Sequence, residues 1–395
     1  MTLPHAATSG ADPDQAFRAG LRQFLAEHHP GRRPNDPGER LAWTKAWLAT
    51  LFDNGYAGPG WPREFGGMDL SFAQQVIYHE EVARARVPGP PGTGVGIAAP
   101  TIIRYGTREQ KQRWLAPMLR GDKVWAQGYS EPEAGSDLPS LRTTARRDGA
   151  EYIVSGQKIW TSHAADADVF FTLVRTGTQE SRQRGITYLV IDAHAPGVQV
   201  RPLRDLTGGH QFAEVFFDDV RVPVGNRIGE ENDGWRLART SLGHERTAGA
   251  MSQAEMYRRV LTELEELARE RGLLADPLVR DQFVDLEIRV GIIRYKAQAA
   301  IGDILAKGKA GPVSSISRLL ITAFEQDIHE FALDLLGPVG LLGKSAPQAV
   351  QRSRWLHGFL RTRASTIGAG TREIQLNTVA EQVLGLPHEP GMPAR

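Results

Sequence analysis

One stretch of the sequence, Trp125–Ser162, holds the residue types best suited to bind a flat and polar molecule. It contains a turn of small and acidic residues, Ser130–Asp137, and it ends on Trp160–Ser162. The turn offers hydroxyl groups and backbone that a ligand can approach closely, and the end of the stretch offers an indole and further hydroxyls. These groups predict one wall of a site for an aromatic cofactor. The other walls and a catalytic group must come from elsewhere in the chain.

The composition restricts the class of protein that could carry such a site. A chain of 395 residues can form two or three domains, each with its own core. The formal net charge of +1 gives no electrostatic reason to expect nucleic acid or an anionic membrane as a partner. The sequence has no cysteine, which excludes disulfides, zinc thiolates and a cysteine nucleophile.

The chain also lacks the signals of a membrane protein or a metal site. No apolar run approaches the roughly 18 residues that a membrane-spanning helix needs, so we expect no membrane insertion. The N-terminus has neither a basic region nor an apolar region typical of a signal peptide, and we expect a cytoplasmic protein. No metal site is expected, because the histidines do not show ligand spacing: His28 and His29 are adjacent and His163, His194 and His210 are scattered.

Hydrophobic periodicity divides the sequence into three parts. Residues 14–122 carry apolar side chains at helical spacing, residues 124–222 form short β-branched and aromatic runs separated by Gly, Pro and Asp, and the pattern is helical again from Gly234. We therefore expect an N-terminal helical domain over 1–122, a β domain over 123–232 and a C-terminal helical bundle over 233–395. The long helices of the bundle are expected at 236–271, 277–307, 313–336, 349–366 and 371–384.

The predicted fold class is α+β. Strands that follow one another so densely, without helices between them, favour an antiparallel sandwich or barrel over a Rossmann unit. No GxGxxG pattern stands in a βαβ context and no Walker sequence is present, so a nucleotide-like cofactor must be held by another device. The long C-terminal helices are typical of a four-helix-bundle-like domain.

Four motifs now resemble those of a known family, the FAD-dependent acyl-CoA dehydrogenases, and the resemblance covers nearly the whole chain. They are Gly106–Lys111 with the following Leu-Ala-Pro, the turn Tyr129–Asp137, the strand Gly156–Ser162 and the segment Ile367–Gln375. The resemblance implies the family fold, with helical, β and helical domains in that order. It also implies FAD as the cofactor.

The resemblance assigns roles to individual residues of the cofactor site. Side chains or backbone of Gln127, Tyr129, Ser130 and Ser136 would contact FAD, Trp160 would lie against the flavin, and Ser162 would hydrogen-bond near its reactive N5. Thr371 and Glu373 would reach the cofactor from the C-terminal segment. The segment Leu336–Gly340, with Gly337 and Gly340, would reach the cofactor of a neighbouring subunit.

The catalytic base departs from the commonest family pattern. Desaturation of a thioester needs a base at the α-carbon while a hydride leaves the β-carbon. In many family members a Glu before Gly-Thr in the C-terminal segment is the base, but Ala369 stands there. The family has a second solution, a Glu that precedes an Arg on the first long helix of the C-terminal domain, and Glu245-Arg246 matches it. A carboxylate that faces an apolar acyl tunnel has its pKa raised by desolvation, which suits a base.

The substrate site is implied in the same way. Ser136 and Arg246 would help to bind the acyl-CoA, Arg246 through its CoA portion. The backbone N–H of Ala369 would hold the thioester oxygen together with a ribityl hydroxyl of FAD, as an oxyanion hole. Family members whose base lies on the long helix take branched, long or ring-bearing acyl groups, so we expect one of these.

The sequence therefore predicts an acyl-CoA dehydrogenase that passes electrons to an electron-transfer flavoprotein and assembles as a homo- or hetero-tetramer. Three alternatives stay open. A flavin monooxygenase or oxidase could use the same fold, the chain could be a subunit that only completes the FAD site of a catalytic sibling, and the acyl group could be carried by a carrier protein instead of CoA.

Overall fold

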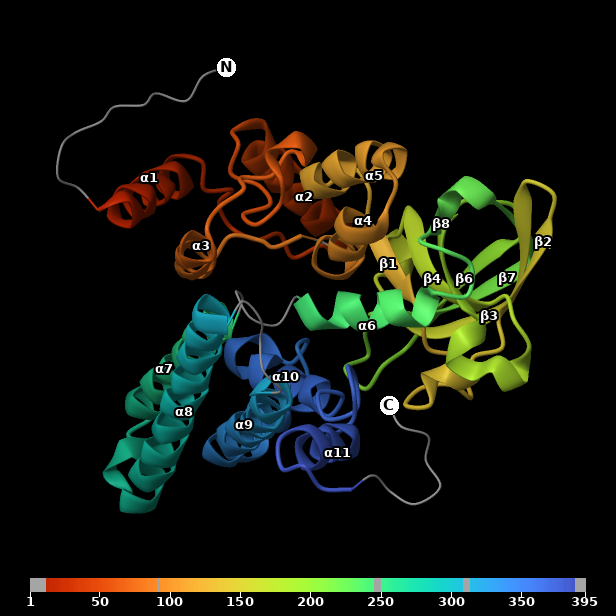
Figure 1. The fold of residues 1–395 in the computed structure, drawn as a ribbon. Coiled ribbons are helices and arrows are strands. Elements are labelled where there is room, and N and C mark those ends of the chain that lie inside the picture. The colour runs from red at the N-terminus through yellow and green to blue at the C-terminus, as the bar shows by residue number, and fades with distance from the viewer. Residues whose placement is uncertain (1–11, 91, 245–249, 308–312, 388–395) are drawn as a thin grey trace. The chain divides into compact units, whose positions relative to one another are not determined.

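A computed structural model describes residues 12–90, 92–244, 250–307, 313–387 of the chain (Figure 1). The chain divides into two compact units, 1–125 and 126–395. The element order is helices, then strands, then helices, so the predicted α+β class and the order of its three parts are confirmed.

The first unit is built from helices, most of which begin at a residue whose side chain caps the helix. Its α-helices are α1 (Pro13–Glu27), α2 (Pro37–Asp53), α3 (Phe72–Ala85), α4 (Ala99–Tyr105) and α5 (Arg108–Arg120). Thr107 and Gln110, whose spacing is typical of a capping box, form one at the start of α5, in which each side chain bonds the other residue's backbone N–H. Leu21, Trp47 and Leu115 are among the buried residues of this unit.

The β part of the second unit is one twisted sheet with the strand order β6-β7-β3-β2-β4-β5-β8, and β1 pairs with β4 beside it. Its strands are β1 (Trp125–Gly128), β2 (Thr144–Asp148), β3 (Glu151–Ser162), β4 (Val169–Arg175), β5 (Ile186–Asp192), β6 (Val198–Leu203), β7 (Phe212–Pro223) and β8 (Arg227–Ile228). The ladders along this order are antiparallel except between β2 and β4, which meet in parallel at Thr144 and Arg175. Phe170, Val215 and Tyr152 belong to its core.

Two irregularities in β3 shape the region of interest. The ladder between β3 and β7 shifts register between Val154 and Gly156, and again between Lys158 and Thr161. Trp160 lies in the second irregularity with a φ of 59°, in the left-handed region that a bulky residue rarely adopts. The alternation of inward and outward side chains therefore breaks at Trp160, at the end of the strand that the sequence singled out.

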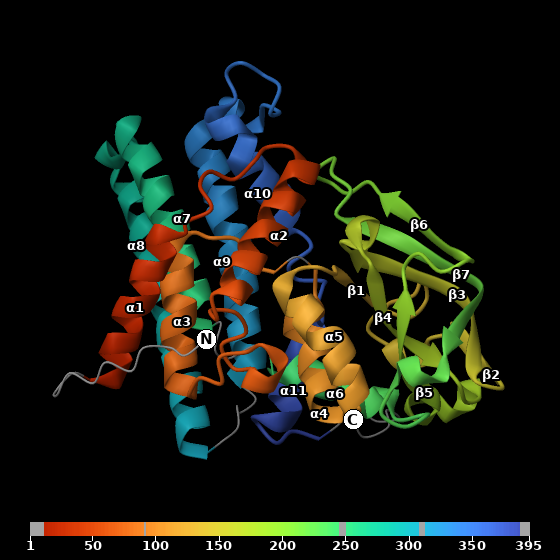
Figure 2. The same cartoon turned by 90° about the horizontal axis from the view of Figure 1, so that it is seen from above.

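The C-terminal part of the second unit is helical. Its α-helices are α6 (Gly234–His244), α7 (Ala250–Glu270), α8 (Pro277–Lys307), α9 (Val313–Leu336), α10 (Arg354–Thr362) and α11 (Arg372–Gln382), with 3-10 turns at Gly337–Leu341 and Val350–Ser353. Helix α8 packs against α7 and α9, and α9 also packs against α10 and α11, as both views show (Figures 1 and 2). The bundle core includes Leu264, Phe324 and Trp355.

The bundle differs from the sequence-based expectation in one helix. A helix was expected over 349–366, but α10 spans only Arg354–Thr362. Gln351, Arg352 and Ser353 all have positive φ, which no right-handed helix accommodates, and a series of turns follows α10. A single helix was expected over 236–271. Helices α6 and α7 lie within or beside this range, and residues 245–249 between them lie outside the described residues.

No described helix combines the length with the apolar character that crossing a bilayer requires.

Candidate functional site

The turn Ser130–Asp137 and the strand end Trp160–Ser162 meet in the structure, as the sequence predicts. The N–H of Ile159 donates to the carbonyl oxygen of Ser130 over 2.9 Å. The ammonium of Lys158 donates to the carbonyl oxygen of Tyr129 over 3.1 Å. The start of the turn is thus attached to β3 at the two positions that precede Trp160.

A buried ion pair strengthens this attachment. Lys158 Nζ lies 2.8 Å from Glu131 Oε1, and the two side chains are 0% and 7% exposed. The Glu131 carboxylate also accepts the backbone N–H groups of Arg142 (2.6 Å) and Thr143 (2.9 Å). This ion pair was not predicted from the sequence.

The ionisation of this pair follows from burial and mutual attraction. Burial alone would raise the pKa of Glu131, but the charge of Lys158 and the hydrogen bonds that the carboxylate accepts outweigh burial and lower this pKa. Burial lowers the pKa of Lys158 to about 8, although the Glu131 carboxylate opposes the shift. Near neutral pH the pair is therefore charged and holds the turn against β3.

A second buried cation fixes the far end of the turn region. Arg175, 4% exposed, donates from Nη2 to the carbonyl oxygens of Pro139 (2.6 Å) and Leu141 (3.2 Å). Its Nη1 donates to the carbonyl oxygen of Arg182 over 2.5 Å, and the guanidinium of Arg182 in turn pairs with Asp137. Carbonyl oxygens thus take the place of a carboxylate partner, and the segment after the turn has little freedom to move.

Trp160 stands out of the sheet as a large exposed aromatic surface. Its side chain is 61% exposed, in contrast to the buried Trp125 and Trp47. One edge of the indole contacts Phe212 of β7, with ring centroids 6.0 Å apart and planes at 83°. The guanidinium of Arg361 lies over the Phe212 ring at 5.7 Å. Phe212 thus supports the indole from one side, and an exposed surface remains for a flat ligand.

Hydroxyl groups of the turn and of the strand end are available to a ligand. Within the part of the chain that the structure describes, the side chains of Ser130, Ser136 and Ser162 have no hydrogen-bond partner, and neither does that of Gln127. The ring of Tyr129 is different, since it is buried edge-on to Phe171 and Tyr188 and leaves only its backbone to a ligand. An exposed indole suits the flat face of an isoalloxazine ring, and unpaired hydroxyls on the attached turn and at the strand end suit its polar edge.

The C-terminal candidates lie in the bundle. The Thr371 hydroxyl accepts the N–H of Ile374 (3.3 Å) and so caps α11. Hydrogen bonds from its own backbone N–H and from the Thr371 hydroxyl lower the pKa of Glu373. Gly337 has a φ of 59° at the end of α9, and Gly340 is buried in the following turn.

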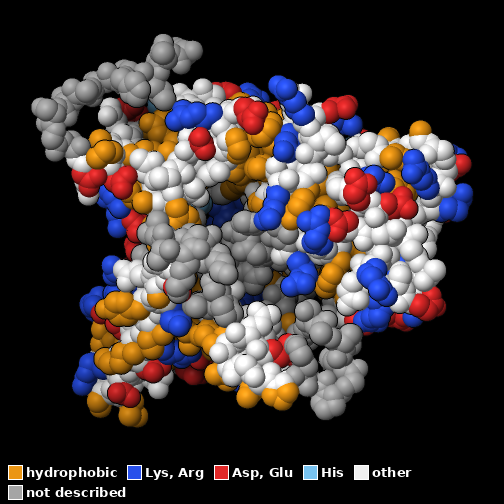
Figure 3. Space-filling view, in the orientation of Figure 1, with side chains coloured by type: hydrophobic (Ala, Val, Ile, Leu, Met, Phe, Trp, Pro, Cys, Tyr) orange, Lys and Arg blue, Asp and Glu red, His pale blue; other side chains and the backbone are white. Residues whose placement is uncertain are grey.

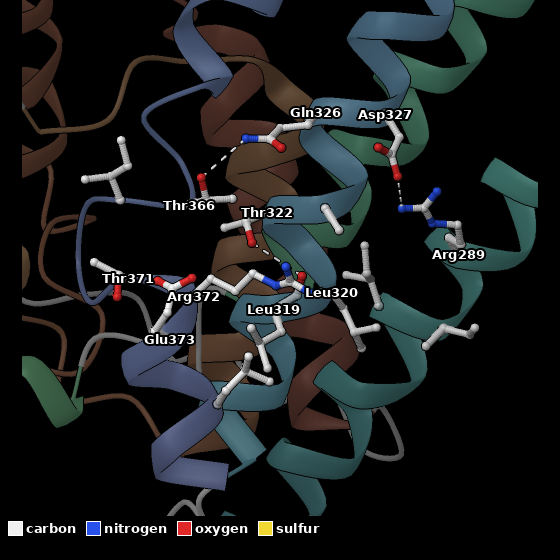
Figure 4. Close-up of a pocket in the computed structure, with 15 residues that line it drawn as sticks. Arg289, Leu319, Leu320, Thr322, Gln326, Asp327, Thr366, Thr371, Arg372 and Glu373 are labelled. Atoms are coloured by element: carbon white, nitrogen blue, oxygen red, sulfur yellow. Dashed lines mark hydrogen bonds and ion pairs between the residues drawn. The ribbon is translucent and has the colours of Figure 1, made fainter. Parts of the chain in front are cut away.

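Thr371 and Glu373 line a pocket of about 650 Å³ between α8, α9 and the start of α11 (Figure 4). Gln326, Thr366 and the ion pair of Arg289 with Asp327 also line it, together with apolar side chains that include Leu319 and Leu320 (Figure 4). No hydrogen bond between described residues joins Thr371 or Glu373 to the stretch Trp125–Ser162. The structure thus brings the predicted cofactor residues together in two groups, one on the sheet and one in the bundle.

The predicted catalytic residues are placed only in part. Glu245 and Arg246 lie outside the described residues. Ala369 is exposed in the turn between α10 and α11, with a φ of 54°.

Comparison with known proteins identifies the class. The N-terminal, middle and C-terminal domain models of the acyl-CoA dehydrogenases match residues 12–122, 126–220 and 232–384. The chain is 38% identical to acyl-CoA dehydrogenase IpdE1 of Mycolicibacterium smegmatis, over 95% of this chain and 98% of that protein.

Two solved structures share the fold over almost their whole length. The steroid ACAD Tcur3481-Tcur3483 is 30% identical with a TM-score of 0.84, covering 96% of this chain and 99% of that one. The ChsE4-ChsE5 complex from Mycobacterium tuberculosis is 31% identical with a TM-score of 0.81, covering 97% and 100%.

The chain belongs to the acyl-CoA dehydrogenase family. It is an oxidoreductase that acts on CH–CH bonds, and its cofactor is FAD. The resemblance drawn from the four sequence motifs is thereby confirmed, together with the fold and the cofactor.

Proposed function

We propose that this chain introduces a double bond between the α- and β-carbons of an acyl-CoA, with Glu245 as the base. The Glu245 carboxylate accepts the α-proton, the β-carbon gives up a hydride, and the electron pair of the α-C–H bond becomes the new π bond. Bound FAD supplies the acceptor for that hydride, at its N5. Glu245 is proposed because the residue at the commoner base position, Ala369, has no group that can accept a proton.

The remaining site residues orient the two reactants. Trp160 holds the flat face of the cofactor, the hydroxyls of Ser130, Ser136 and Ser162 and the amide of Gln127 hydrogen-bond along its edge, and Tyr129 contributes backbone. Thr371 and Glu373 reach the cofactor from the bundle, and the segment that holds Gly337 and Gly340 reaches the cofactor of a neighbouring subunit, where the lack of side chains permits a close approach. Arg246 and Ser136 bind the acyl-CoA.

The observation that carries the proposal is the exposed indole of Trp160, on a strand to which a buried ion pair and a backbone hydrogen bond attach the serine-bearing turn Ser130–Asp137. The test is anaerobic addition of acyl-CoA to the purified FAD-loaded protein. Oxidised flavins absorb visible light at about 450 nm. We expect this absorbance to bleach in proportion to the enoyl-CoA formed. A chain that holds no FAD alone, but completes the site of a sibling, would show no bleaching until the sibling is added.

A flavin oxidase or monooxygenase is the alternative on the same fold. It needs oxygen access and no α-proton base, so the presence of Glu245 favours the dehydrogenase. The two are separated by reoxidation of the reduced enzyme: we expect an electron-transfer flavoprotein to accept electrons faster than O₂. Faster reaction with O₂, with hydrogen peroxide or a hydroxylated product, would favour the alternative.

We infer a ring-bearing acyl group as substrate. Two observations support this: the small residues Gly368 and Ala369 stand where the common base would occupy space, and a structural relative is named a steroid ACAD. The test compares turnover of acyl-CoAs whose acyl chain bears a fused ring system with turnover of short linear acyl-CoAs. Turnover of the short linear substrates alone would contradict the inference. The same panel on a carrier protein tests the choice of carrier.

We infer further that the working assembly is a tetramer in which subunits complete one another's FAD sites. The ChsE4-ChsE5 relative is a complex of two different chains, which makes a hetero-tetramer the favoured form. Native mass spectrometry of the chain alone and with its genomic neighbours would distinguish the homo- from the hetero-tetramer. The cytoplasmic location expected from the sequence stays a prediction, which fractionation of the producing cell would test.

A further inference from the structure

The turn between α10 and α11 is held by side chains that bond its carbonyl oxygens. Arg318 of α9 donates from Nη2 to the carbonyl oxygens of Ser365 (2.8 Å) and Gly368 (2.9 Å). Gln375 of α11, 6% exposed, donates from Nε2 to the carbonyl oxygens of Ala369 (3.3 Å) and Gly370 (3.4 Å). Three successive carbonyl groups, those of residues 368–370, are thus bound by two side chains.

The planar trans peptide bond determines the direction in which the N–H groups of this turn point. The C=O of one residue and the N–H of the next belong to the same plane and point in opposite directions. A side chain that holds the Gly368 carbonyl therefore aims the Ala369 N–H away from itself. The same holds for the N–H groups of Gly370 and Thr371, whose peptide carbonyls are bound by Gln375.

These three N–H groups are available to a ligand. In the described part of the chain, the backbone N–H groups of Ala369, Gly370 and Thr371 have no acceptor, although the N–H groups of Gly368 and Arg372 on either side bond Ala364 and Thr366. Ala369 and Gly370 have φ values of 54° and 91°. Because each carbonyl oxygen is bound on the opposite side of its peptide, these N–H groups are left for a ligand that carries a negative oxygen.

We propose that Arg318 is a positioning residue for the reaction, because it orients and polarises the peptide whose N–H, that of Ala369, binds the thioester oxygen. The proposal rests on the proposed function, in which negative charge develops on that oxygen as the α-proton leaves. Arg318 contributes beyond geometry, since its positive charge draws electron density from the Gly368 carbonyl and makes the Ala369 N–H a stronger donor. Gln375 is neutral and holds the next two peptides, so its contribution is smaller.

The local packing shows that this arrangement tolerates little change. A Cβ at Gly370 would come within 2.4 Å of Gln375 Nε2, so a side chain there would displace the amide that holds two carbonyls. Gln326 holds the start of the same segment through the carbonyl oxygen of Thr362 (3.2 Å). Three side chains from α9 and α11 thus fix the segment on which Ala369 lies.

The test uses Arg318→Met and Arg318→Lys in the FAD-loaded enzyme, in its native assembly. The matched control is Arg363→Met, which removes a cation that pairs with Glu330 of α9 (2.6 Å) but bonds none of the carbonyls of residues 365–370. The probe is acetoacetyl-CoA, whose enolate places negative charge on the thioester oxygen. Its ionisation on the enzyme is followed by absorbance across pH, and turnover of the preferred acyl-CoA is measured in parallel.

For Arg318→Met we expect the pH midpoint of enolate formation to rise by about one unit, and kcat to fall at least about tenfold with KM changed far less. Arg318→Lys should recover part of both, since an ammonium can reach one of the two carbonyls, and Arg363→Met should match the wild type. If Arg318→Met does not retain FAD, a smaller shift in the same direction in the lysine variant supports the proposal, and a midpoint and kcat equal to those of the wild type overturn it.

The outcomes separate this proposal from the function on which it rests. A wild-type enzyme that neither binds acetoacetyl-CoA as the enolate nor oxidises acyl-CoA would contradict both. If the wild-type enzyme does both, and the Arg318 variants have the same pH midpoint and the same kcat as the wild type, only the role of Arg318 is overturned. An equal loss of kcat in Arg318→Met and Arg363→Met would also overturn it, because the loss would then follow from removing any cation of the bundle.

Discussion

Replacing Lys158 by methionine removes the cation that attaches the turn Ser130–Asp137 to β3. The side chain is fully buried, and methionine keeps much of its length and apolar stem. The variant leaves the Glu131 carboxylate buried without its ion-pair partner and removes the hydrogen bond that Lys158 donates to the carbonyl oxygen of Tyr129. Both effects act on the segment between Tyr129 and Trp160.

The magnitude follows from what Glu131 keeps. Removal of one partner of a buried ion pair costs about 3–5 kcal/mol in the free energy of unfolding. Glu131 retains two hydrogen bonds, from the backbone N–H groups of Arg142 and Thr143, so the lower end, about 3 kcal/mol, is expected. At about 2–4 °C per kcal/mol for a domain of this class, the Tm falls by about 6–12 °C. The double variant Lys158→Met/Glu131→Gln removes the stranded charge and should recover about 1 kcal/mol or more.

The assay is thermal unfolding of the apo- and FAD-loaded forms, with FAD content measured by absorbance. The control is Arg142→Met, which removes an ion pair with Glu133 in the same turn, where both side chains are 72% exposed and the expected change is below about 1 kcal/mol. We expect Lys158→Met to lose FAD affinity as well as stability. A Tm and FAD content equal to those of Arg142→Met, or a double variant less stable than Lys158→Met, would refute this reasoning.

Further predictions concern the bundle and acid stability. Gly358→Ala should destabilise the bundle by about 1–3 kcal/mol, because a Cβ would meet the His329 ring at 2.0 Å. Gly302→Ala, in α8 with no atom within 4 Å of its Cβ, should stabilise by about 0.5–1 kcal/mol instead; chemical denaturation measures both, and equal effects would contradict the packing argument. Burial lowers the pKa of His329 below its usual 6.5, so the unfolded chain binds more protons just below pH 6.5 and the free energy of unfolding falls as the pH drops. His329→Gln should flatten that decline, and an unchanged slope would contradict the assigned cause. The pKa of Glu131 is lowered from 4.5, so its stabilising contribution is lost as the pH falls below about 4.5, and Glu131→Gln should reduce acid sensitivity in that range.

Much of the fold could be predicted because each part of the chain has its own periodicity. Helical spacing, short β-branched runs and helical spacing again gave the three parts in order, and the Thr107 capping box gave the start of α5. The end of α10 could not be predicted, since apolar spacing continued past Thr362 while the backbone turned. The three positive φ values at Gln351–Ser353 carry no glycine signal in the sequence.

The residue types of the site could be predicted from the sequence, but their arrangement in space could be predicted only partly. Alternation along β3 places Lys158 on the same face as the buried Tyr152 and Val154, so a buried cation could have been inferred. The bulge that turns Trp160 outward could not, because tryptophan rarely has a positive φ. Arg318 of α9 and Gln375 of α11 bond the carbonyl oxygens of the turn after α10. Arg318 is distant from this turn in the sequence, and no local pattern indicates such a contact.

The central claim, that Glu245 is the catalytic base, is tested most directly by the rate of anaerobic flavin reduction in Glu245→Gln. The matched control is Glu255→Gln, an exposed carboxylate on α7. With FAD content and acyl-CoA affinity unchanged, we expect the Glu245 variant to reduce its flavin about 10²–10⁴ times more slowly and the control to match the wild type. Addition of Ala369→Glu to the Glu245 variant should restore part of the rate by supplying a carboxylate at the other base position. Reduction by Glu245→Gln at the wild-type rate would contradict the account.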